Sequence, residues 1–489
     1  MKTTALIAAP ESVAASVLVI PAFEKEKDDV SSPFHPLDSA LGGWIGEVYA
    51  SGEFTGKSFE CAILHRPPAS LKAKRVAVVG AGKKSAYGAA EARKLASFVV
   101  RHFRAQADSL VFLSDHVSEA IEGAILGSWE QDHHKSTGKK ENKIAEFTVV
   151  VPTGNAHAIQ AAASEGHIIG ESQNFARDLV NEPGNILPPR VLVERGAAMA
   201  RHFGLSVDIL DQDRMRQLGM GSLLGVAMGS AEPPFLMVIS YRPETKSSST
   251  DHLGLVGKGV TFDTGGVSIK PADGMEKMKC DMGGAAAMLG AMRAIAQLKP
   301  SIPVTAFIPT VENMCGSKSQ RPGDIVTSMS GRTIEVLNTD AEGRLILIDA
   351  ITYAKQQGCT HLIDAATLTG AIGVALGSVN TGVFSNNDAM CARLMKAASS
   401  EGEKMWRMPV DDEYREQLKS AYADIANIGG RAGGACTAAM FLKDWVEDTP
   451  WAHLDIALTA YLDEPKPFTA KGATGVGVRT FTRVALDWQ

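Results

Sequence analysis

VGKGVTFDTGGVSIKPADGMEKMKCDMGGAA fills Val256–Ala286, and NTDAEGRL fills Asn338–Leu345. Each of these glycine-rich stretches follows a short apolar run, and such runs between helical segments predict the strands of an α/β protein. Ligands of α/β proteins bind where the carboxyl ends of the strands meet the loops. We therefore expect the functional site of this chain to lie in these two stretches.

The two stretches carry four carboxylates, which are Asp263, Asp281, Asp340 and Glu342. Clustered carboxylates raise one another's pKa, and two divalent cations would balance their four negative charges. Oxygen-rich sites of this kind hold two ions ~3.5–4 Å apart and activate a bridging water. Because Asp340 and Glu342 are two residues apart, an extended segment would point both side chains the same way. The glycines would let the backbone approach the ions closely. The pattern predicts a hydrolytic site with two metal ions.

Three basic residues, Lys258, Lys270 and Arg344, lie among these carboxylates. A lysine amine can bind a metal only when it is neutral, and nearby cations and burial both lower its pKa. A charged lysine and an arginine can stabilise the negative tetrahedral intermediate of acyl transfer. Helix caps, turns and salt bridges would explain any one of these residues, but they explain the whole set poorly.

Short apolar runs alternate with helical segments along most of the chain. The predicted strands are Val17–Ile20, Val76–Val79, Leu110–Leu113, Leu236–Tyr241, Leu253–Gly257, Val304–Ile308, Thr333–Leu337 and His361–Ala365. The predicted helices are Glu91–Arg104, Ala158–Asn181, Ala285–Gln297 and Leu345–Lys355. A chain of 489 residues is too long for one ordinary core.

The fold class predicted from this alternation is α/β, with two domains that each have a central, mainly parallel sheet flanked by helices. Residues 1–157 would form an N-terminal α/β domain, and 158–182 a long connecting helix that ends at Asn181-Glu182-Pro183-Gly184. Residues 183–489 would form a C-terminal catalytic domain that contains both glycine-rich stretches.

Composition and charge exclude several classes of protein. The formal net charge of −6 argues against sequence-independent binding to nucleic acid, which needs a basic surface. The six cysteines include no CxxC pair, which indicates reduced thiols rather than disulfides or zinc fingers. Pro10 and Glu11 interrupt the first apolar run, and no run approaches the ~20 apolar residues that span a bilayer. We expect a cytoplasmic protein with no membrane partner.

Two other motifs suggest ligands but fail in detail. Val76–Gly88 resembles a dinucleotide fingerprint, but Ser85 stands at the third glycine position, and Lys84 breaks the P-loop pattern. The pair His133-His134 lies in the charged stretch Gln131–Lys143, which is typical of an exposed loop. The chain contains neither HExxH nor GxSxG, so neither a zincin nor a serine nucleophile elbow is indicated.

The motifs of residues 170–489 together resemble the leucyl aminopeptidase family, the cytosol aminopeptidases with two metals. NTDAEGRL looks like the family's signature, and VGKGVTFDTGG and MKCDMGGAA look like its metal-binding segments. NEPGNILPP near Asn181, DAATLTGA near Asp364 and HLDIA at His453 extend the resemblance. The preceding residues match only in general α/β character.

The resemblance implies an aminopeptidase that releases N-terminal residues, preferably Leu and other apolar ones, through a metal-bridging water. It implies that the two metals are bound by Lys258, Asp263, Asp281, Asp340 and Glu342, with Asp263 and Glu342 bridging. Lys270 would polarise the substrate carbonyl, and Arg344 would hold a bicarbonate ion that serves as general base. Backbone groups near Gly343 and Leu368 would help to bind this anion at the start of the helix after Arg344. The remaining substrate- or anion-binding residues would be Met278, Asn338 and Thr367.

The resemblance also implies manganese or zinc as the metals, although oxygen-rich sites accept cobalt or magnesium too. It implies a homohexamer whose active sites face an interior cavity.

Three alternative functions stay open. Another two-metal hydrolase, such as a phosphoesterase or another dipeptidase, would usually add histidine ligands, which this set lacks. A DNA-binding accessory protein would need a basic stripe on the N-terminal domain. A scaffold with a dead site is disfavoured by the complete ligand set.

Overall fold

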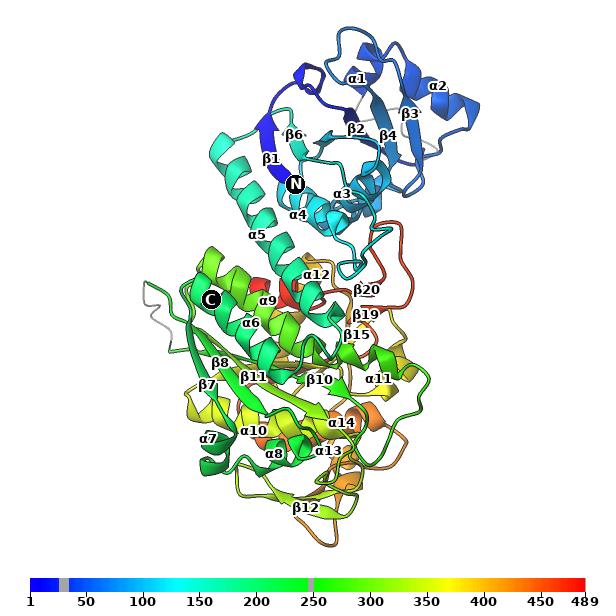
Figure 1. Cartoon of the computed structure of the whole chain (residues 1–489). Helices are drawn as coiled ribbons and strands as arrows, with labels where there is room; N and C mark the ends of the chain where they lie inside the picture. Colours follow the sequence, from blue (N-terminus) through cyan, green and yellow to red (C-terminus); the bar gives the residue numbers. More distant parts are fainter. Residues whose placement is uncertain (26–34, 245–249, 489) are drawn as a thin grey trace. The chain divides into compact units, whose positions relative to one another are not determined.

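The computed structural model describes residues 1–25, 35–244 and 250–488, and it divides into two compact units. The first unit comprises Met1–Asn174 with Asp463–Lys471, and the second comprises Phe175–Leu462 with Gly472–Gln489. The 26-residue helix α5 (Ala156–Asn181) contributes to both units, because the division falls within it (Figure 1). Each unit is built around its own sheet.

The first unit contains a six-stranded sheet in the order β1-β6-β5-β2-β4-β3. Its strands are β1 (Lys2–Ile7), β2 (Val17–Ala22), β3 (Cys61–Leu64), β4 (Val76–Gly80), β5 (Ser109–Leu113) and β6 (Glu146–Val151). All neighbouring strands are parallel except β3 and β4. Helices α3 (Ala89–Phe103) and α4 (Val117–Ser128) cover one face, and α1 (His35–Ala40) and α2 (Trp44–Ser51) cover the other. Successive residues of β2 pack alternately into these two layers, as the period of a buried strand requires.

The second unit contains a nine-stranded sheet in the order β16-β15-β18-β14-β9-β11-β8-β7, with β10 paired to the end of β11. These strands are β7 (Ser206–Leu210), β8 (Phe235–Tyr241), β9 (Leu253–Gly257), β10 (Gly259–Asp263), β11 (Val304–Asn313), β14 (His361–Ala366), β15 (Thr381–Ser385), β16 (Met405–Arg407) and β18 (Trp451–Asp455). The central strands β18, β14, β9 and β11 are parallel, while β7, β8 and β15 add antiparallel pairs.

Helices cover both faces of this sheet (Figure 1). One layer contains α6 (Pro189–His202), α9 (Gly283–Leu298), α12 (Asp388–Ser400) and α15 (Val478–Leu486). The other contains α7 (Gln212–Gln217), α8 (Gly221–Ala227), α10 (Glu342–Gln356), α11 (Gly370–Leu376) and α14 (Gly434–Val446). A short helix, α13 (Asp412–Arg415), packs against α14. No helix of residues 1–25, 35–244 and 250–488 is both long and apolar enough to cross a membrane.

Two small sheets and the 3₁₀ helices η3 (Met275–Met282) and η4 (Glu416–Leu418) complete the described part of the second unit. The three-stranded sheet is β12 (Asp324–Thr327), β13 (Thr333–Val336) and β17 (Ile425–Ala426), and the two-stranded sheet is β19 (Tyr461–Leu462) and β20 (Gly472–Ala473). The 3₁₀ helix η3 leads directly into α9.

The topology brings the two glycine-rich stretches, Val256–Ala286 and Asn338–Leu345, together at the carboxyl ends of several strands. The carboxyl ends of β9, β14 and β18 are adjacent, since Gly257 pairs with Ala365 and Asp455 with Ala366. At the end of β11, Asn313 pairs with Asp263 of β10. The segment after β13 then supplies Asn338 and the start of α10.

The predicted α/β class, with two mainly parallel sheets flanked by helices, is confirmed. The strand Lys2–Ile7 was not predicted, because only Ala5 of this edge strand is fully buried and its apolar pattern is weak. The strand expected at Val304–Ile308 continues to Asn313, and that extension carries it to the site.

Candidate metal centre

Lys258 is buried at the end of β9 and bridges two carboxylates. Its Nζ lies 2.8 Å from Asp281 Oδ1 and 2.8 Å from Glu342 Oε1, and it donates to the main-chain oxygen of Thr367 at 2.9 Å. Burial lowers the pKa of Lys258, but the charges of Asp281, Glu342 and Asp263 outweigh burial and raise this pKa above its ordinary value. The lowering that we expected depends on bound cations and stays a prediction.

Lys270 bridges the other pair of carboxylates. Its Nζ lies 2.8 Å from Asp263 Oδ2 and also contacts Asp340 Oδ1. Burial again lowers the pKa, and the charges of Asp263, Glu342 and Asp340 raise it overall. Lys258 is almost wholly buried, whereas Lys270 keeps 21% of its side chain exposed. Lys270 is thus the cation that can be reached from solvent.

The four carboxylates converge on one small volume. Asp263, Asp340 and Glu342 each place an oxygen within 4.8 Å of the others, and Asp281 joins them through Lys258. Burial, together with the neighbouring carboxylates, raises the pKa of both Asp281 and Glu342. Burial also raises the pKa of Asp340, and the charge of Lys270 partly offsets this increase.

The donor set fits divalent cations. Asp281 Oδ2 and Glu342 Oε2 are buried acceptors that receive no hydrogen bond from the described residues. A buried carboxylate oxygen without a donor is costly, and a metal ion removes that cost. Hard oxygen donors with one amine suit ions such as Mn²⁺ or Zn²⁺.

The local backbone brings Asp340 and Glu342 together by a route that differs from our expectation. Asp340 lies in a turn, and Glu342 is the first residue of α10, so the segment is not extended. The N–H of Asp340 donates to Asn338 Oδ1 at 2.9 Å, which is typical of an Asx turn. We expected the side chains of Asp340 and Glu342 to point the same way because the segment would be extended. That reason was wrong, although a carboxylate oxygen of each residue reaches the cluster.

Gly343 allows α10 to approach Lys258. A Cβ at this position would lie 2.7 Å from Lys258 Cε and 2.9 Å from its Nζ. Gly343 therefore packs against the lysine stem and is not among the residues that line the cavity. Only glycine leaves room for the lysine here.

Arg344 is buried within the first turn of α10, whereas we had expected it to precede the helix. Its Nη1 donates to the main-chain oxygen of Asn427 at 2.7 Å, and its buried Nε has no hydrogen-bond partner in the part of the chain that the structure describes. Burial lowers the pKa of Arg344 to about 10. The backbone N–H of Leu368 already donates to Asp455 Oδ1, at 3.2 Å.

A cavity of about 530 Å³ opens onto these groups. Every residue expected at the site lines it except Gly343, including Met278, Asn338, Thr367 and Leu368. The apolar part of the lining is contributed by Pro271, Met275, Met278, Leu368, Ala371, Ile428, Ala457 and Leu458. Its size is that of a small-molecule site.

Sequence reasoning missed three buried polar residues that hold the site. Asn313 donates to Asp263 Oδ1 at 2.8 Å, Asn427 donates to the main-chain oxygen of Asn338 at 2.7 Å, and Asp455 accepts from Thr369 Oγ1 at 2.7 Å. Asn313 and Asp455 each end a strand next to the site, and that position was the one available signal.

The motifs that we set aside have structural explanations. A Cβ on Gly80 would lie 1.9 Å from the main-chain oxygen of Lys57, and Gly82 has φ +75°, so both glycines serve a tight turn. His133 and His134 are exposed, on a loop.

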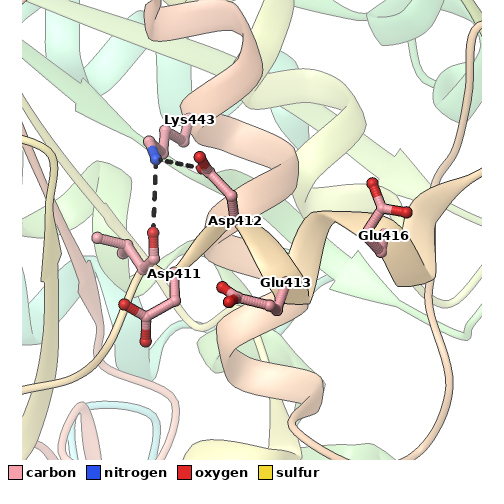
Figure 2. Close-up of a pocket in the computed structure, with 6 residues that line it drawn as sticks. Asp411, Asp412, Glu413, Glu416 and Lys443 are labelled. Carbon is pink, nitrogen blue, oxygen red and sulfur yellow. Dashed lines mark hydrogen bonds and ion pairs between the residues drawn. The ribbon is translucent and has the colours of Figure 1, made fainter.

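A second hollow of about 550 Å³ is acidic but lacks the features of the metal centre (Figure 2). It is lined by Val410, Asp411, Asp412, Glu413, Glu416 and Lys443. Its four carboxylates are all exposed, and Lys443 Nζ reaches Asp412 Oδ1 at 3.1 Å. Hydrated surface carboxylates need no metal to balance them.

Family models locate both units among known proteins. The catalytic domain of the cytosol aminopeptidase family matches residues 174–482, and the family's N-terminal domain matches 19–138. The chain belongs to the cytosol aminopeptidase family. Membership makes it a metal-dependent aminopeptidase, a hydrolase of peptide bonds, and confirms the resemblance drawn from the motifs.

Relatives match along nearly the whole chain. A probable cytosol aminopeptidase of Solibacter usitatus is 55% identical, over 98% of this chain and 97% of the relative. One from Koribacter versatilis is 47% identical, over 98% of each chain. Among solved structures, a mutant of tomato leucine aminopeptidase has a TM-score of 0.89 at 36% identity, over 99% of this chain and 96% of its own. The bottromycin maturation enzyme BotP, in complex with Mn, has a TM-score of 0.84 at 32% identity, over 97% of this chain and 99% of its own.

Proposed function

We propose that the chain releases N-terminal amino acids from peptides, preferably Leu and other apolar residues, using two divalent ions per subunit. The observation that carries this proposal is the convergence of four buried or half-buried carboxylates and two lysines on one cavity. Lys258, Asp263, Asp281, Asp340 and Glu342 would hold the ions. When bound, the ions supply an activated water and a Lewis acid for the scissile carbonyl.

Lys270 would polarise the substrate carbonyl and stabilise the negative charge that develops on it. Its partial exposure lets a substrate approach it. A positive group aimed at a developing oxyanion is a large contributor to catalysis of acyl transfer.

Arg344 would hold a bicarbonate ion, and when bound this anion would supply a general base. The support is its buried Nε, which has no partner among residues 1–25, 35–244 and 250–488, and its place in the cavity lining. Asn427 anchors the opposite side of the guanidinium through Nη1. Backbone groups near Gly343 would assist, while the Leu368 N–H would have to leave Asp455 to do so.

Met278 and Thr367 would line the pocket for the first side chain of the peptide, and Asn338 would contact its backbone. The methionine, leucine and alanine side chains in the cavity lining support an apolar preference. Each additional methylene in such a pocket contributes about 1–3 kcal/mol to discrimination.

Manganese or zinc would be the physiological metal, and the Mn complex of BotP supports manganese. Residues 183–489 would form the catalytic domain, after a connecting helix at 158–182. A cytoplasmic location is part of the same proposal, supported by the family's name and by six free thiols. A homohexamer is proposed with it, as the resemblance to the family implies and as closed symmetry would allow.

The test is hydrolysis of a Leu-peptide and of its N-acetylated form by protein loaded with Mn²⁺. We expect cleavage of the free peptide alone, because an aminopeptidase recognises the N-terminal amine. Chelation of the metal should abolish this cleavage, and added Mn²⁺ should restore it. Equal rates on the two peptides would exclude an aminopeptidase, and full activity of metal-stripped protein would exclude the metal mechanism.

A further inference from the structure

Asn313 is a buried amide that joins the two metal-binding stretches. It ends β11 and is only 2% exposed. Its Nδ2 donates to Asp263 Oδ1 at 2.8 Å and to the main-chain oxygen of Thr339 at 3.0 Å. Because both partners can only accept, the amide nitrogen and not the amide oxygen must face them. One side chain thus links a carboxylate of the first stretch to the backbone of the second.

The contact determines which oxygen of Asp263 is available to the cluster. Asp263 Oδ1 also accepts from the N–H of Gly265 at 2.8 Å. With two donors on Oδ1, Oδ2 is the oxygen that faces Lys270 Nζ, at 2.8 Å. Outer partners of this kind orient carboxylate ligands and tune the affinity for the metal.

The second contact of Asn313 positions the loop that carries Asp340. Thr339 immediately precedes Asp340, and its own side chain is tied to the first stretch. Thr339 Oγ1 donates to the main-chain oxygen of Gly265 at 2.7 Å and accepts from the N–H of Ser268 at 2.8 Å. Hydrogen bonds of Asn313 and Thr339 therefore join the two loops.

We propose that Asn313 is a positioning residue that sets the spacing between Asp263 and Asp340, and with it the affinity of the centre for divalent cations. This inference rests on the proposed function, because it assigns a task to a residue behind the metal ligands. Asn313 is not among the residues that line the cavity, so it acts through Asp263 and the Thr339 carbonyl.

The chain provides a matched control in Asn386. Its Nδ2 also donates to two main-chain oxygens, those of Glu447 at 3.2 Å and Thr449 at 3.0 Å. It therefore joins two backbone segments of the same unit, as Asn313 does, but it reaches no carboxylate of the metal centre.

The experiment compares Asn313→Ala and Asn386→Ala with the unsubstituted chain in calorimetric titrations with Mn²⁺. We expect Asn313→Ala to weaken Mn²⁺ binding about 10–100-fold, as loss of an outer partner does at other metal sites. Asn386→Ala should leave the affinity unchanged. Electron paramagnetic resonance reports magnetic coupling between neighbouring Mn²⁺ ions, and this coupling should change only in the Asn313 variant.

Asn313→Leu keeps most of the side-chain volume without a donor, and it replaces the alanine variant if that protein does not fold. Unaltered Mn²⁺ affinity and coupling in a folded Asn313 variant would overturn this inference alone. Equal weakening in both asparagine variants would also overturn it, since the effect would then reflect general loop support. Failure of the unsubstituted chain to bind Mn²⁺ would overturn the proposed function, and the inference with it.

Discussion

Lys258 and Lys270 have similar partners but different surroundings. Each ammonium bridges two carboxylates, but Lys258 is also held by the main-chain oxygen of Thr367 and packed against Gly343. Lys270 comes from a loop and keeps partial exposure. A fixed, enclosed amine suits a metal ligand, whereas a reachable ammonium suits contact with substrate. The same residue type can thus serve two proposed roles within one cavity.

Lys270→Ala and Arg344→Ala should separate metal binding from turnover. We expect each variant to keep its metal and to lose about 10²–10³ in kcat, because each removes a group that acts on the reacting atoms. Metal analysis and steady-state kinetics on a leucine anilide check both numbers. Lys443→Ala, which breaks the exposed pair with Asp412, should change neither. An unchanged kcat in both site variants would contradict the assigned roles.

Gly343→Ala should damage the metal centre without damaging the helix. The new Cβ would lie within 3 Å of three atoms of the Lys258 side chain, which would have to move away from Asp281 and Glu342. Alanine is otherwise the better helix former, by about 1 kcal/mol. We expect reduced Mn²⁺ affinity with an unchanged circular dichroism spectrum. Gly46→Ala in α2, where the new Cβ meets only Asp38, at 3.4 Å, is the control and should bind Mn²⁺ normally.

Among the elements, α10 carries residues of the metal site in its first turn and, near its middle, a buried carboxyl group that holds the helix to neighbouring segments. Glu342 and Arg344 lie in its first turn, and Asp349 is fully buried one to two turns later. Asp349 accepts from the N–H of Leu223 in α8 at 2.9 Å and from that of Met329 at 2.8 Å. This carboxyl therefore ties α10 to two neighbouring segments, and burial raises its pKa to about 7.

The raised pKa of Asp349 predicts a stability that falls as pH rises. Between the ordinary pKa near 3.8 and the folded value of about 7, the unfolded chain has released a proton that the folded chain retains. The contribution from this group should thus decrease by about 2–3 kcal/mol from pH 5 to pH 8. Asp349→Asn should remove this slope. Urea unfolding of both proteins at the two pH values measures it, and equal slopes would contradict the assignment.

The elements differ in how far sequence alone could predict them. Strands such as Val76–Gly80 could be predicted because burial on both faces requires a continuous β-branched run. The cluster at Asp340 and Glu342 could be predicted from composition, but its turn and helix start could not be distinguished from an extended segment. Asn313 and Asn427 lie 50 and 89 residues from the partners that they hold, so only the topology reveals their contacts.

At the scale of the whole molecule, the sheet order explains how residues far apart in the sequence come to form one site. The metal-binding groups come from the ends of β9 and β10, from η3 and from the start of α10. Helix α9 and strands β11, β12 and β13 separate the first three of these elements from α10 in the sequence. The second unit also leaves large apolar side chains exposed, among them Ile269 (63%), Val374 (92%), Trp406 (60%) and Tyr422 (78%). Exposed apolar and aromatic residues are the kind that interfaces between subunits cover.

The proposed homohexamer predicts a particle of about 310 kDa, six times the 51.8 kDa of one chain. Closed point-group symmetry is the usual form of such assemblies, and it would place every copy in the same environment. Light scattering coupled to size exclusion measures this mass. Because assembly follows mass action, dilution should shift mass and stability together. If the active species is instead a stable particle with the mass of one chain, the hexamer must be abandoned, while the metal centre, which lies within a single unit, would stand.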